Sequence, residues 1–239
     1  MKKFIKILIF TILLVIFILL FFLIVLYLIT ASDIEKRLDF LINEKRTISL
    51  SELKTGDLIL FSNTTDPISL TMEMMQSSYV YHIGMVLCIN NEILIWESSP
   101  SAENDKVQII PLEKKMKDHH YSDYILIRQL YPPITDFETL AMIIDESSHI
   151  EYDSSCIQHG IQRFKTFFQF QNNDTFIPCS IKPPDKLYCS QFIAYIMTKM
   201  GYLDQSKLMD DILPLHFTQI NQALPFHSSH FLDKEFILI

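Results

Sequence analysis

An apolar run near the N-terminus constrains this chain more than any other feature. The run extends from Ile7 to Ile29, carries no charge and is interrupted only by one threonine and one tyrosine. As a helix it is long enough to cross the hydrocarbon core of a bilayer, which needs about 20 apolar residues. A cleaved signal peptide is the alternative, and residues 29–31 could serve as a weak cleavage site. The apolar core of a signal peptide is usually shorter, at roughly 7 to 15 residues. We therefore predict that residues 1–30 form a retained transmembrane anchor.

The charges on either side of this run indicate how the chain would sit in a membrane. Lys2, Lys3 and Lys6 precede the run, and basic residues tend to stay on the cytoplasmic side. This pattern favours a cytoplasmic N-terminus and a main domain across the membrane. Other basic residues follow the run and act against that orientation, namely Lys36, Arg37, Lys45 and Arg46. The sequence thus predicts a single-pass protein with a lipid bilayer as the partner of residues 7–29, and it leaves open which membrane and which side.

The remainder of the chain is acidic. The three early lysines belong to a total of 20 basic residues, so the rest carries 17 basic against 28 acidic residues, a net charge of −11. Such a balance argues against nucleic acid as a partner. The four cysteines show no pairing pattern and fit no disulfide scaffold of a small secreted domain; they are Cys88, Cys156, Cys179 and Cys189. Nothing in the composition indicates an oligomeric state.

Beyond the anchor, the pattern predicts a stalk and one α+β domain. Residues 31–47 are mixed in charge and helix-prone, which is typical of a stalk. The domain is expected over residues 48–239, because a turn at Gly56-Asp57 leads directly into an apolar strand. The predicted strands are 58–61, 79–89, 92–97, 107–110, 124–130 and 235–239. Helices are predicted at 69–77, 135–147 and 156–170, in addition to the one described below.

Two of these strands form a predicted hairpin that would bring a histidine and a glutamate together. Asn90-Asn91 separates the strands, and such a pair is typical of a tight hairpin turn. His82 lies near the start of the first strand and Glu97 near the end of the second. In an antiparallel pair these positions lie at the same end, so we expect their side chains to be within reach of one another. Either residue alone is more often structural, and only the pair indicates a function.

A cysteine at the start of a predicted helix is the third candidate. The helix would begin at Cys189, shortly after Pro183-Pro184, and end at Gly201, which favours the left-handed conformation of a helix stop. Its buried face is predicted from apolar residues at helical spacing, namely Phe192, Ile193, Ile196, Met197 and Met200. Unpaired N–H groups at a helix start favour thiolate over thiol, the state that a nucleophile needs. The alternative is a small core residue, the usual role of a free cysteine.

Two other groups of residues resemble parts of metal sites but lack the rest. His119-His120 lies in the charged segment Glu113–Asp123, which is expected at the surface, and no suitably spaced ligand accompanies the pair. Cys156 and His159 are three residues apart, like half of a zinc site, yet no second half stands out. We therefore expect neither a metal ion nor an organic cofactor.

Cys189, His82 and Glu97 together have the residue types of a cysteine-dependent hydrolase. A thiol nucleophile needs a base to take its proton, a polar group to orient the imidazole, and donors for the oxyanion. Cys189 would be the nucleophile, His82 the base and Glu97 the orienting residue. The backbone N–H of Cys189 would donate to the oxyanion.

Six short motifs between about residues 50 and 220 follow one another in the order of a known family. They are Leu53-Lys54-Thr55-Gly56-Asp57-Leu58-Ile59-Leu60, Ser78-Tyr79-Val80-Tyr81-His82-Ile83-Gly84-Met85-Val86, Trp96-Glu97-Ser98, Tyr152-Asp153, Tyr188-Cys189-Ser190-Gln191-Phe192 and Leu213-Pro214-Leu215. With these motifs the sequence resembles the circularly permuted branch of the NlpC-type cysteine amidases and peptidases. This is the YiiX/YaeF-like group, which includes poxvirus and giant-virus members.

The resemblance implies a permuted papain-like fold, in which an antiparallel sheet or barrel packs with helices. It also implies catalytic Cys189 and His82, with Glu97 as the third residue. Two positions depart from the family pattern, since Tyr81 replaces the usual serine before His82 and Gln191 replaces the usual glutamate after Ser190. These departures bear on the choice of substrate.

Three functions are compatible with these observations. The leading prediction is a membrane-anchored cysteine hydrolase that cleaves an amide or peptide bond through an acyl-enzyme on Cys189. The related lecithin:retinol acyltransferase-like group shares the permuted layout and acts on lipids, so a lipid acyl hydrolase or acyltransferase is the second. The third is a membrane-tethered binding protein without turnover, in which the thiol has ordinary reactivity. An unrelated anchored domain would instead separate Cys189, His82 and Glu97 in space.

Overall fold

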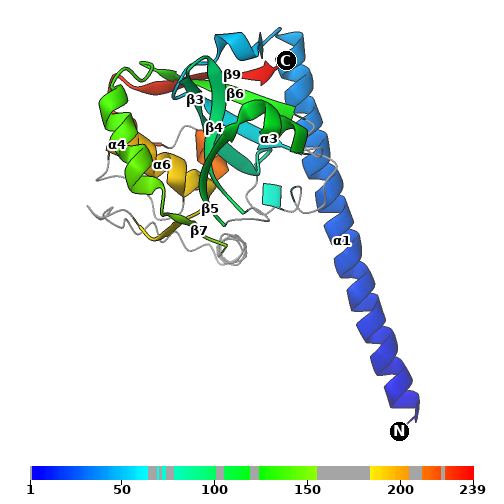
Figure 1. Ribbon diagram of the computed structural model, residues 1–239. Helices are drawn as coiled ribbons and strands as arrows, with labels where there is room; N and C mark the ends of the chain where they lie inside the picture. The colour runs from blue at the N-terminus through cyan, green and yellow to red at the C-terminus, as the bar shows by residue number, and fades with distance from the viewer. Residues whose placement is uncertain are drawn as a thin grey trace.

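A long N-terminal helix and a nine-stranded sheet are the two main parts of the computed structural model (Figure 1). The structure describes residues 2–63, 69, 72–73, 78–100, 105–118, 124–154, 184–204, 212–221 and 224–239. The long helix, α1, extends from Lys2 to Asn43 without a break, and its N-terminal part projects away from the rest of the chain. Among the described residues, further helices are α3 (Leu112–Asp118), α4 (Phe137–Ser147) and α6 (Cys189–Lys199), and 3-10 turns occur at Leu50–Glu52 and Pro214–Phe217.

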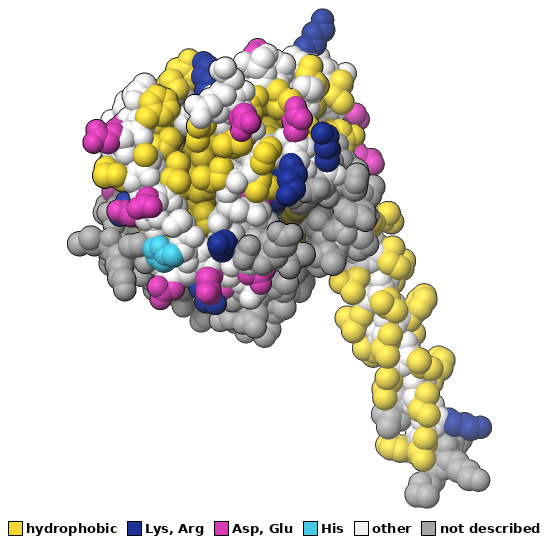
Figure 2. Space-filling view, viewed as in Figure 1, with side chains coloured by type: hydrophobic (Ala, Val, Ile, Leu, Met, Phe, Trp, Pro, Cys, Tyr) yellow, Lys and Arg dark blue, Asp and Glu magenta, His cyan; other side chains and the backbone are white. Residues whose placement is uncertain are grey.

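The projecting part of α1 is strongly apolar. A window within Phe4–Asn43 has a mean hydropathy of 3.6, and none of it is buried against the rest of the protein. Figure 2 shows hydrophobic side chains along most of the visible length of this part. A helix that is hydrophobic on its exposed surface is suited to lipid rather than water. One N-terminal helix is therefore long and apolar enough to span a membrane, properties that signal sequences share.

The strands form one open sheet in the order β1-β9-β6-β2-β3-β4-β5-β7-β8. Their bounds are β1 Thr47–Ile48, β2 Leu58–Ser62, β3 His82–Ile89, β4 Glu92–Ser99, β5 Lys106–Pro111, β6 Tyr124–Tyr131, β7 Glu151–Tyr152, β8 Lys186–Leu187 and β9 Phe231–Leu238. Neighbouring strands are antiparallel except for the parallel pairs β1/β9 and β7/β8. The predicted combination of helices with a mainly antiparallel sheet is confirmed. Within the described ranges β1 and β8 are its two edges, so the sheet is not closed into a barrel.

Turn and cap chemistry explains several element boundaries. Asn90 and Asn91 have positive φ angles of 52° and 64°, as a tight hairpin turn requires, and they join β3 to β4. The side chain of Asp136 caps α4 by accepting a hydrogen bond from the N–H of Thr139 at 2.9 Å. Gly201 has a φ of 77° just beyond α6, which is the left-handed stop expected there.

The predicted elements can be compared with the structure wherever it describes them. The hairpin, the α4 helix and the helix that begins at Cys189 are confirmed. The strand predicted over 79–89 begins three residues later, at His82. The predicted helix 156–170 and most of the predicted helix 69–77 lie outside the described residues.

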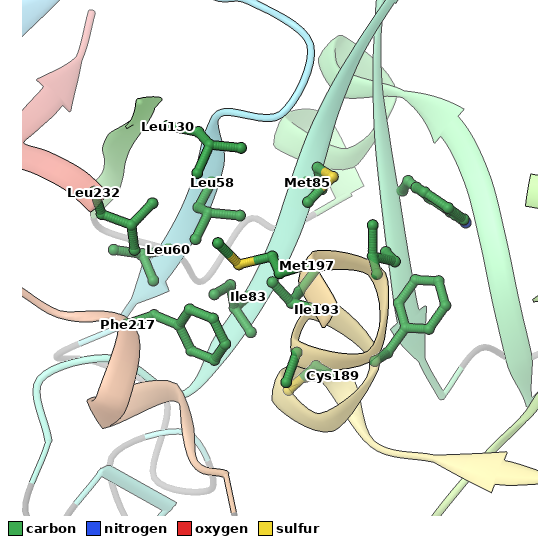
Figure 3. Packing of buried hydrophobic residues seen from close by; sticks show 14 of the residues in the cluster. Leu58, Leu60, Ile83, Met85, Leu130, Cys189, Ile193, Met197, Phe217 and Leu232 are labelled. Carbon is green, nitrogen blue, oxygen red and sulfur yellow. The ribbon is translucent and has the colours of Figure 1, made fainter. Parts of the chain in front are cut away.

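Helices cover both faces of the sheet, and each face has its own apolar core. On one face, α6 packs against β3 and β4 and lies beside α4. Figure 3 shows Ile193 and Met197 of α6 directed toward strand residues such as Ile83 and Met85. On the other face, the fully buried Leu112 of α3 belongs to a second cluster with residues of β2, β3, β4 and β6. Burying each such side chain stabilises the fold by about 1.5–3 kcal/mol.

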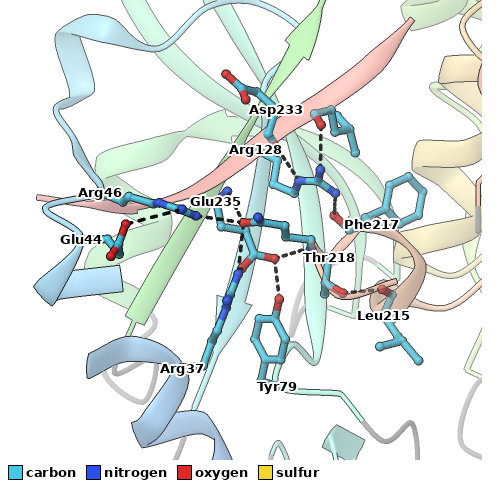
Figure 4. A network of polar contacts seen from close by, with 12 residues as sticks. Arg37, Glu44, Arg46, Tyr79, Arg128, Leu215, Phe217, Thr218, Asp233 and Glu235 are labelled. Atoms are coloured by element: carbon cyan, nitrogen blue, oxygen red, sulfur yellow. Dashed lines mark hydrogen bonds and ion pairs between the residues drawn. The ribbon is translucent and has the colours of Figure 1, made fainter. Parts of the chain in front are cut away.

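The last turns of α1 belong to the folded body. Leu38 and Leu41 are 2% and 0% exposed and pack in the same core as α6. Arg37 forms an ion pair with the buried Glu235 of β9, with 2.7 Å between Nη2 and Oε2. Tyr79 donates a hydrogen bond to the same carboxylate (Figure 4). Residues 31–43, predicted as part of a stalk, thus continue the helix and pack on the sheet through their last turns.

Candidate active site

The first residue of β3 and a residue near the end of β4 are in direct contact. Nε2 of His82 lies 2.7 Å from Oε2 of Glu97, and the two residues are only 7% and 0% exposed. Phe61 of β2 lies beside the imidazole, with 5.5 Å between ring centroids. The structure thus brings together the pair that the hairpin predicts. Because little water reaches them, their electrostatic interaction is stronger than it would be at the surface.

The strand register explains why these two side chains meet. Met85 of β3 pairs with Trp96 of β4 in an antiparallel ladder. That pairing puts Gly84 opposite Glu97 and puts His82 diagonally across from the carboxylate, on the same face. A Cβ atom at Gly84 would lie 2.6 Å from the side chain of Ile95. The glycine two residues after His82 therefore permits the close packing of this face.

The other oxygen of Glu97 accepts from two further elements. Gln108 of β5, directly opposite in the register, donates from Nε2 to Oε1 at 2.8 Å. Lys115 of α3 forms an ion pair with the same oxygen. Lys115 is only 5% exposed, and its ammonium lies 5.8 Å from the ring centroid of Phe61. The carboxylate is therefore held between an imidazole on one oxygen and an ammonium group on the other.

Sequence reasoning missed both of these residues. The prediction that Glu113–Asp123 lies at the surface is wrong for Lys115, which lies on the buried face of α3. Lys115 and Met116 follow Leu112 by three and four residues, and residues so spaced share one helix face. Because Leu112 is buried, this spacing was the available signal. The position of Gln108 depends on the β4/β5 register, which the sequence does not specify.

Cys189 is the first residue of α6 and is 7% exposed. Its thiol lies near enough to the imidazole of His82 to help raise the pKa of that histidine. Since Nε2 of His82 already contacts Glu97, Nδ1 is the ring nitrogen left for the thiol. The three residues predicted for the site therefore lie together, although α6 and the helix that carries Lys115 cover opposite faces of the sheet.

Two buried serines hold the start of α6 in place. The hydroxyl of Ser98, next to Glu97 on β4, donates to the carbonyl oxygen of Leu187 at 2.7 Å. The hydroxyl of Ser190 donates to the carbonyl oxygen of Ile212 at 2.6 Å. Figure 3 shows Cys189 at the end of α6, one turn before Ile193. The backbone just before Cys189 is thus hydrogen-bonded to β4, the strand that carries Glu97, and this limits the movement of the thiol relative to His82.

Neighbouring charges shift the pKa values of His82 and Glu97 in opposite directions. Burial alone would lower the pKa of His82, but the nearby Glu97 carboxylate and the thiol of Cys189 outweigh it and raise the pKa from 6.5 to about 9. Burial alone would raise the pKa of Glu97, yet His82 and Lys115 outweigh it and lower the pKa from 4.5 to about 2. At neutral pH the structure therefore favours an imidazolium facing a carboxylate.

The described part of the chain contains no cluster of three or more histidine, cysteine, aspartate or glutamate side chains that could hold a metal ion. His119-His120, Cys156 and His159 lie outside the described residues. Cys88 and Cys189, the two described cysteines, are free thiols.

A solved structure is among the known proteins that this chain is similar to. A scan against models of protein families and a search of curated proteins each find no match. Among solved structures, the chain is similar to the metalloprotein YiiX from Escherichia coli O157:H7. The sequence identity is 16%, the TM-score is 0.43, and the alignment covers 75% of this chain and 96% of that chain.

Proposed function

We propose that this protein is a membrane-anchored cysteine hydrolase that cleaves an amide or peptide bond through an acyl-enzyme on Cys189. The observation that carries the proposal is the buried series of contacts from Cys189 through His82 to Glu97. A histidine between a thiol and a carboxylate is oriented by the carboxylate and takes the proton of the thiol. Cys189 is thus the nucleophile, His82 the base and Glu97 the orienting residue.

The electrostatics of the site support an imidazolium at His82. The raised pKa of His82, about 9, means that the imidazole is protonated at neutral pH and has a proton to give to a leaving group. The N–H groups in the first turn of α6 have no partner within the helix. That of Cys189 lies closest to the sulfur and would donate to the oxyanion of a bound carbonyl.

The reaction would take two stages. The thiolate sulfur of Cys189 attacks the carbonyl carbon, the imidazolium of His82 gives its proton to the leaving nitrogen, and the C–N bond breaks to leave a thioester. His82 then takes a proton from water, whose oxygen attacks the thioester carbon and displaces the sulfur as thiolate. The acid product leaves, and the starting pair of charges is restored.

The resemblance of the six motifs to the permuted NlpC-type group supports the same proposal at the level of fold. In that interpretation residues 48–239 form a permuted papain-like domain, linked by residues 31–47 to the anchor at 1–30. The packing of the cysteine helix on the strands that carry His82 and Glu97 agrees with such a fold. The lysines before the apolar run favour a non-cytoplasmic domain.

A lipid substrate is the second candidate, and one observation favours it. The last turns of α1 pack on the sheet through Leu38, Leu41 and Arg37, so the domain is not on a free tether. With the apolar part of α1 in a bilayer, the site would stay close to the lipid surface. A thioester on Cys189 serves ester cleavage or acyl transfer as well as amide cleavage.

The direct test is acyl transfer to Cys189 in the full chain, purified in detergent. The protein is mixed with peptide p-nitroanilides, acyl p-nitrophenyl esters or phosphatidylcholine vesicles, quenched in acid and digested for mass spectrometry. We expect an acyl adduct on the Cys189 peptide and none in Cys189→Ala. Cys88→Ala removes the other described thiol and serves as the matched control that keeps the adduct.

The anilide and the vesicles separate the candidate functions, and the ester shows whether Cys189 can be acylated at all. An adduct from the anilide supports the amide hydrolase, and one from the vesicles alone supports the lipid enzyme. No adduct from any of them, with Cys189 intact, would leave the tethered binding protein as the better interpretation.

A further inference from the structure

Lys115 is a buried cation in contact with the proposed active site. It is 5% exposed and forms an ion pair with Oε1 of Glu97, while His82 contacts Oε2. Burying an ammonium group is costly, and a buried ion pair is often no more stabilising than apolar residues of similar volume. Overall stability therefore gives little reason for a lysine at this position, and its effect on the neighbouring charges has to be considered.

The groups around the imidazole come from several elements. Glu97 of β4 and Cys189 of α6 face His82 directly, Lys115 of α3 reaches it through the shared carboxylate, and Tyr81 lies beside it with 6.4 Å between ring centroids. In the ionised state that the proposed reaction requires, with a thiolate and an imidazolium, this group holds two cations and two anions. Without Lys115, the carboxylate and the thiolate would face the imidazolium with no second cation nearby.

We propose that Lys115 is a positioning residue that acts on His82 through Glu97. It occupies one oxygen of the carboxylate so that the other faces the imidazole, and its fixed charge limits how tightly the carboxylate retains the imidazolium proton. Like charges near one another disfavour the charged form of a titrating group. The consequence is a better general acid, since His82 must release that proton to the leaving group. This inference rests on the proposed function, in which His82 carries the proton.

The test is the titration of His82 followed by NMR in the full chain, with labelled histidine and the His82→Ala variant to assign the signal. In Lys115→Met we expect the His82 midpoint to rise by on the order of one pH unit, because a nearby positive charge is lost. Lys115→Arg keeps the charge and should leave the midpoint within a few tenths of a unit. Gln108→Leu is the matched control, since it removes a neutral donor from the same oxygen and should have the smaller effect.

An unchanged or lower midpoint in Lys115→Met would overturn the inference. A lower midpoint would show that the lysine only holds the carboxylate in place. Should Lys115→Met not fold, Lys115→Gln also removes the charge, keeps a donor, and must raise the midpoint. No substrate enters this titration, so a failure of turnover at Cys189 would count against the proposed function and leave the midpoint to decide on Lys115.

Discussion

Two buried glutamates on the same sheet have similar surroundings and different consequences. Glu97 on β4 and Glu235 on β9 are both 0% exposed. Each forms an ion pair with a side chain from a helix, Lys115 of α3 for the first and Arg37 of α1 for the second. A buried carboxylate beside a cation is therefore not by itself the mark of an active site.

The two glutamates differ in the residue that contacts the other carboxylate oxygen. Glu97 contacts His82, whose pKa is raised to about 9 and which also interacts with Cys189. Glu235 instead accepts from the hydroxyl of Tyr79. Burial and the charge of Glu235 raise the pKa of that phenol further above its ordinary value, so it stays a neutral donor. The Glu235 network holds α1 on the sheet, whereas the Glu97 network includes the histidine to which we assign the proton transfer.

The largest expected effect separates the histidine from the tyrosine. His82→Ala should lower acyl-enzyme formation at Cys189 by about 10²–10⁴-fold, the usual contribution of a general base. Tyr79→Phe, which removes only the hydroxyl on Glu235, should keep the rate within a few fold. Both rates come from quenched mass spectrometry with the best substrate. Equal losses in the two variants would mean that the two networks do not differ as described.

The second prediction is that a change in the Glu235 network affects stability and leaves the reactivity of Cys189 unchanged. Glu235→Gln should destabilise the fold by about 3–5 kcal/mol, because it leaves the guanidinium of Arg37 without its buried partner. The measurement is denaturant unfolding in a fixed detergent. Cys189 should keep its wild-type reactivity at denaturant concentrations where the variant is still folded. A loss of reactivity without a loss of stability would contradict the structural role of Glu235.

The third prediction concerns pH and compares wild type with the double variant Glu97→Gln, His82→Ala. The pKa of Glu97 is depressed, so its stabilising effect is present above about pH 4.5 and lost as pH falls toward about 2. The pKa of His82 is raised, so its effect is present below about pH 6.5 and lost as pH rises through about 9.

The stability difference should therefore be largest between about pH 4.5 and 6.5. It should then shrink by on the order of 3 kcal/mol up to about pH 10, since each unit of pKa shift corresponds to about 1.4 kcal/mol. Unfolding curves at a series of pH values measure it. A difference that grows between pH 7 and 10 would exclude a charged pair.

The smallest expected effect tests the attachment of α6. Ser98→Ala removes the hydrogen bond to the carbonyl oxygen of Leu187 and should cost about 1 kcal/mol. Ser99→Ala is the matched control, because the hydroxyl of Ser99 makes only a long contact, 3.4 Å, with the carbonyl oxygen of Pro100. Unfolding curves should separate the two variants, and Cys189 should react more slowly only in the first. Equal behaviour would mean that Ser98 does not hold the helix start.

Local sequence signals account for much of the fold and for part of the site. Asn90-Asn91 and Gly201 are backbone positions with positive φ, so the hairpin and the end of α6 could be predicted from residue type. The contact between His82 and Glu97 follows from that hairpin alone. These features depend on neighbours in the chain, which pattern analysis describes well.

The rest depends on contacts between distant segments. Glu97 pairs with Gln108 only in one β4/β5 register, and Lys115 reaches the same oxygen only because α3 packs on that face. Likewise, residues 31–43 have the composition of a stalk, and the ion pair between Arg37 of α1 and the distant Glu235 of β9 shows that they belong to the folded body. A charged side chain is expected at the surface until its buried partner is known.

The most direct test of the proposed site is the rate at which iodoacetamide labels Cys189 as a function of pH, in the full chain and in His82→Ala. Peptide mass spectrometry resolves each cysteine, and Cys88 is an internal reference, since burial raises the pKa of its thiol. We predict that Cys189 reacts rapidly near pH 6, where Cys88 is nearly inert, and that His82→Ala abolishes this reactivity. Labelling of Cys189 that follows Cys88 at every pH and is indifferent to His82 would contradict the proposal of an activated thiol.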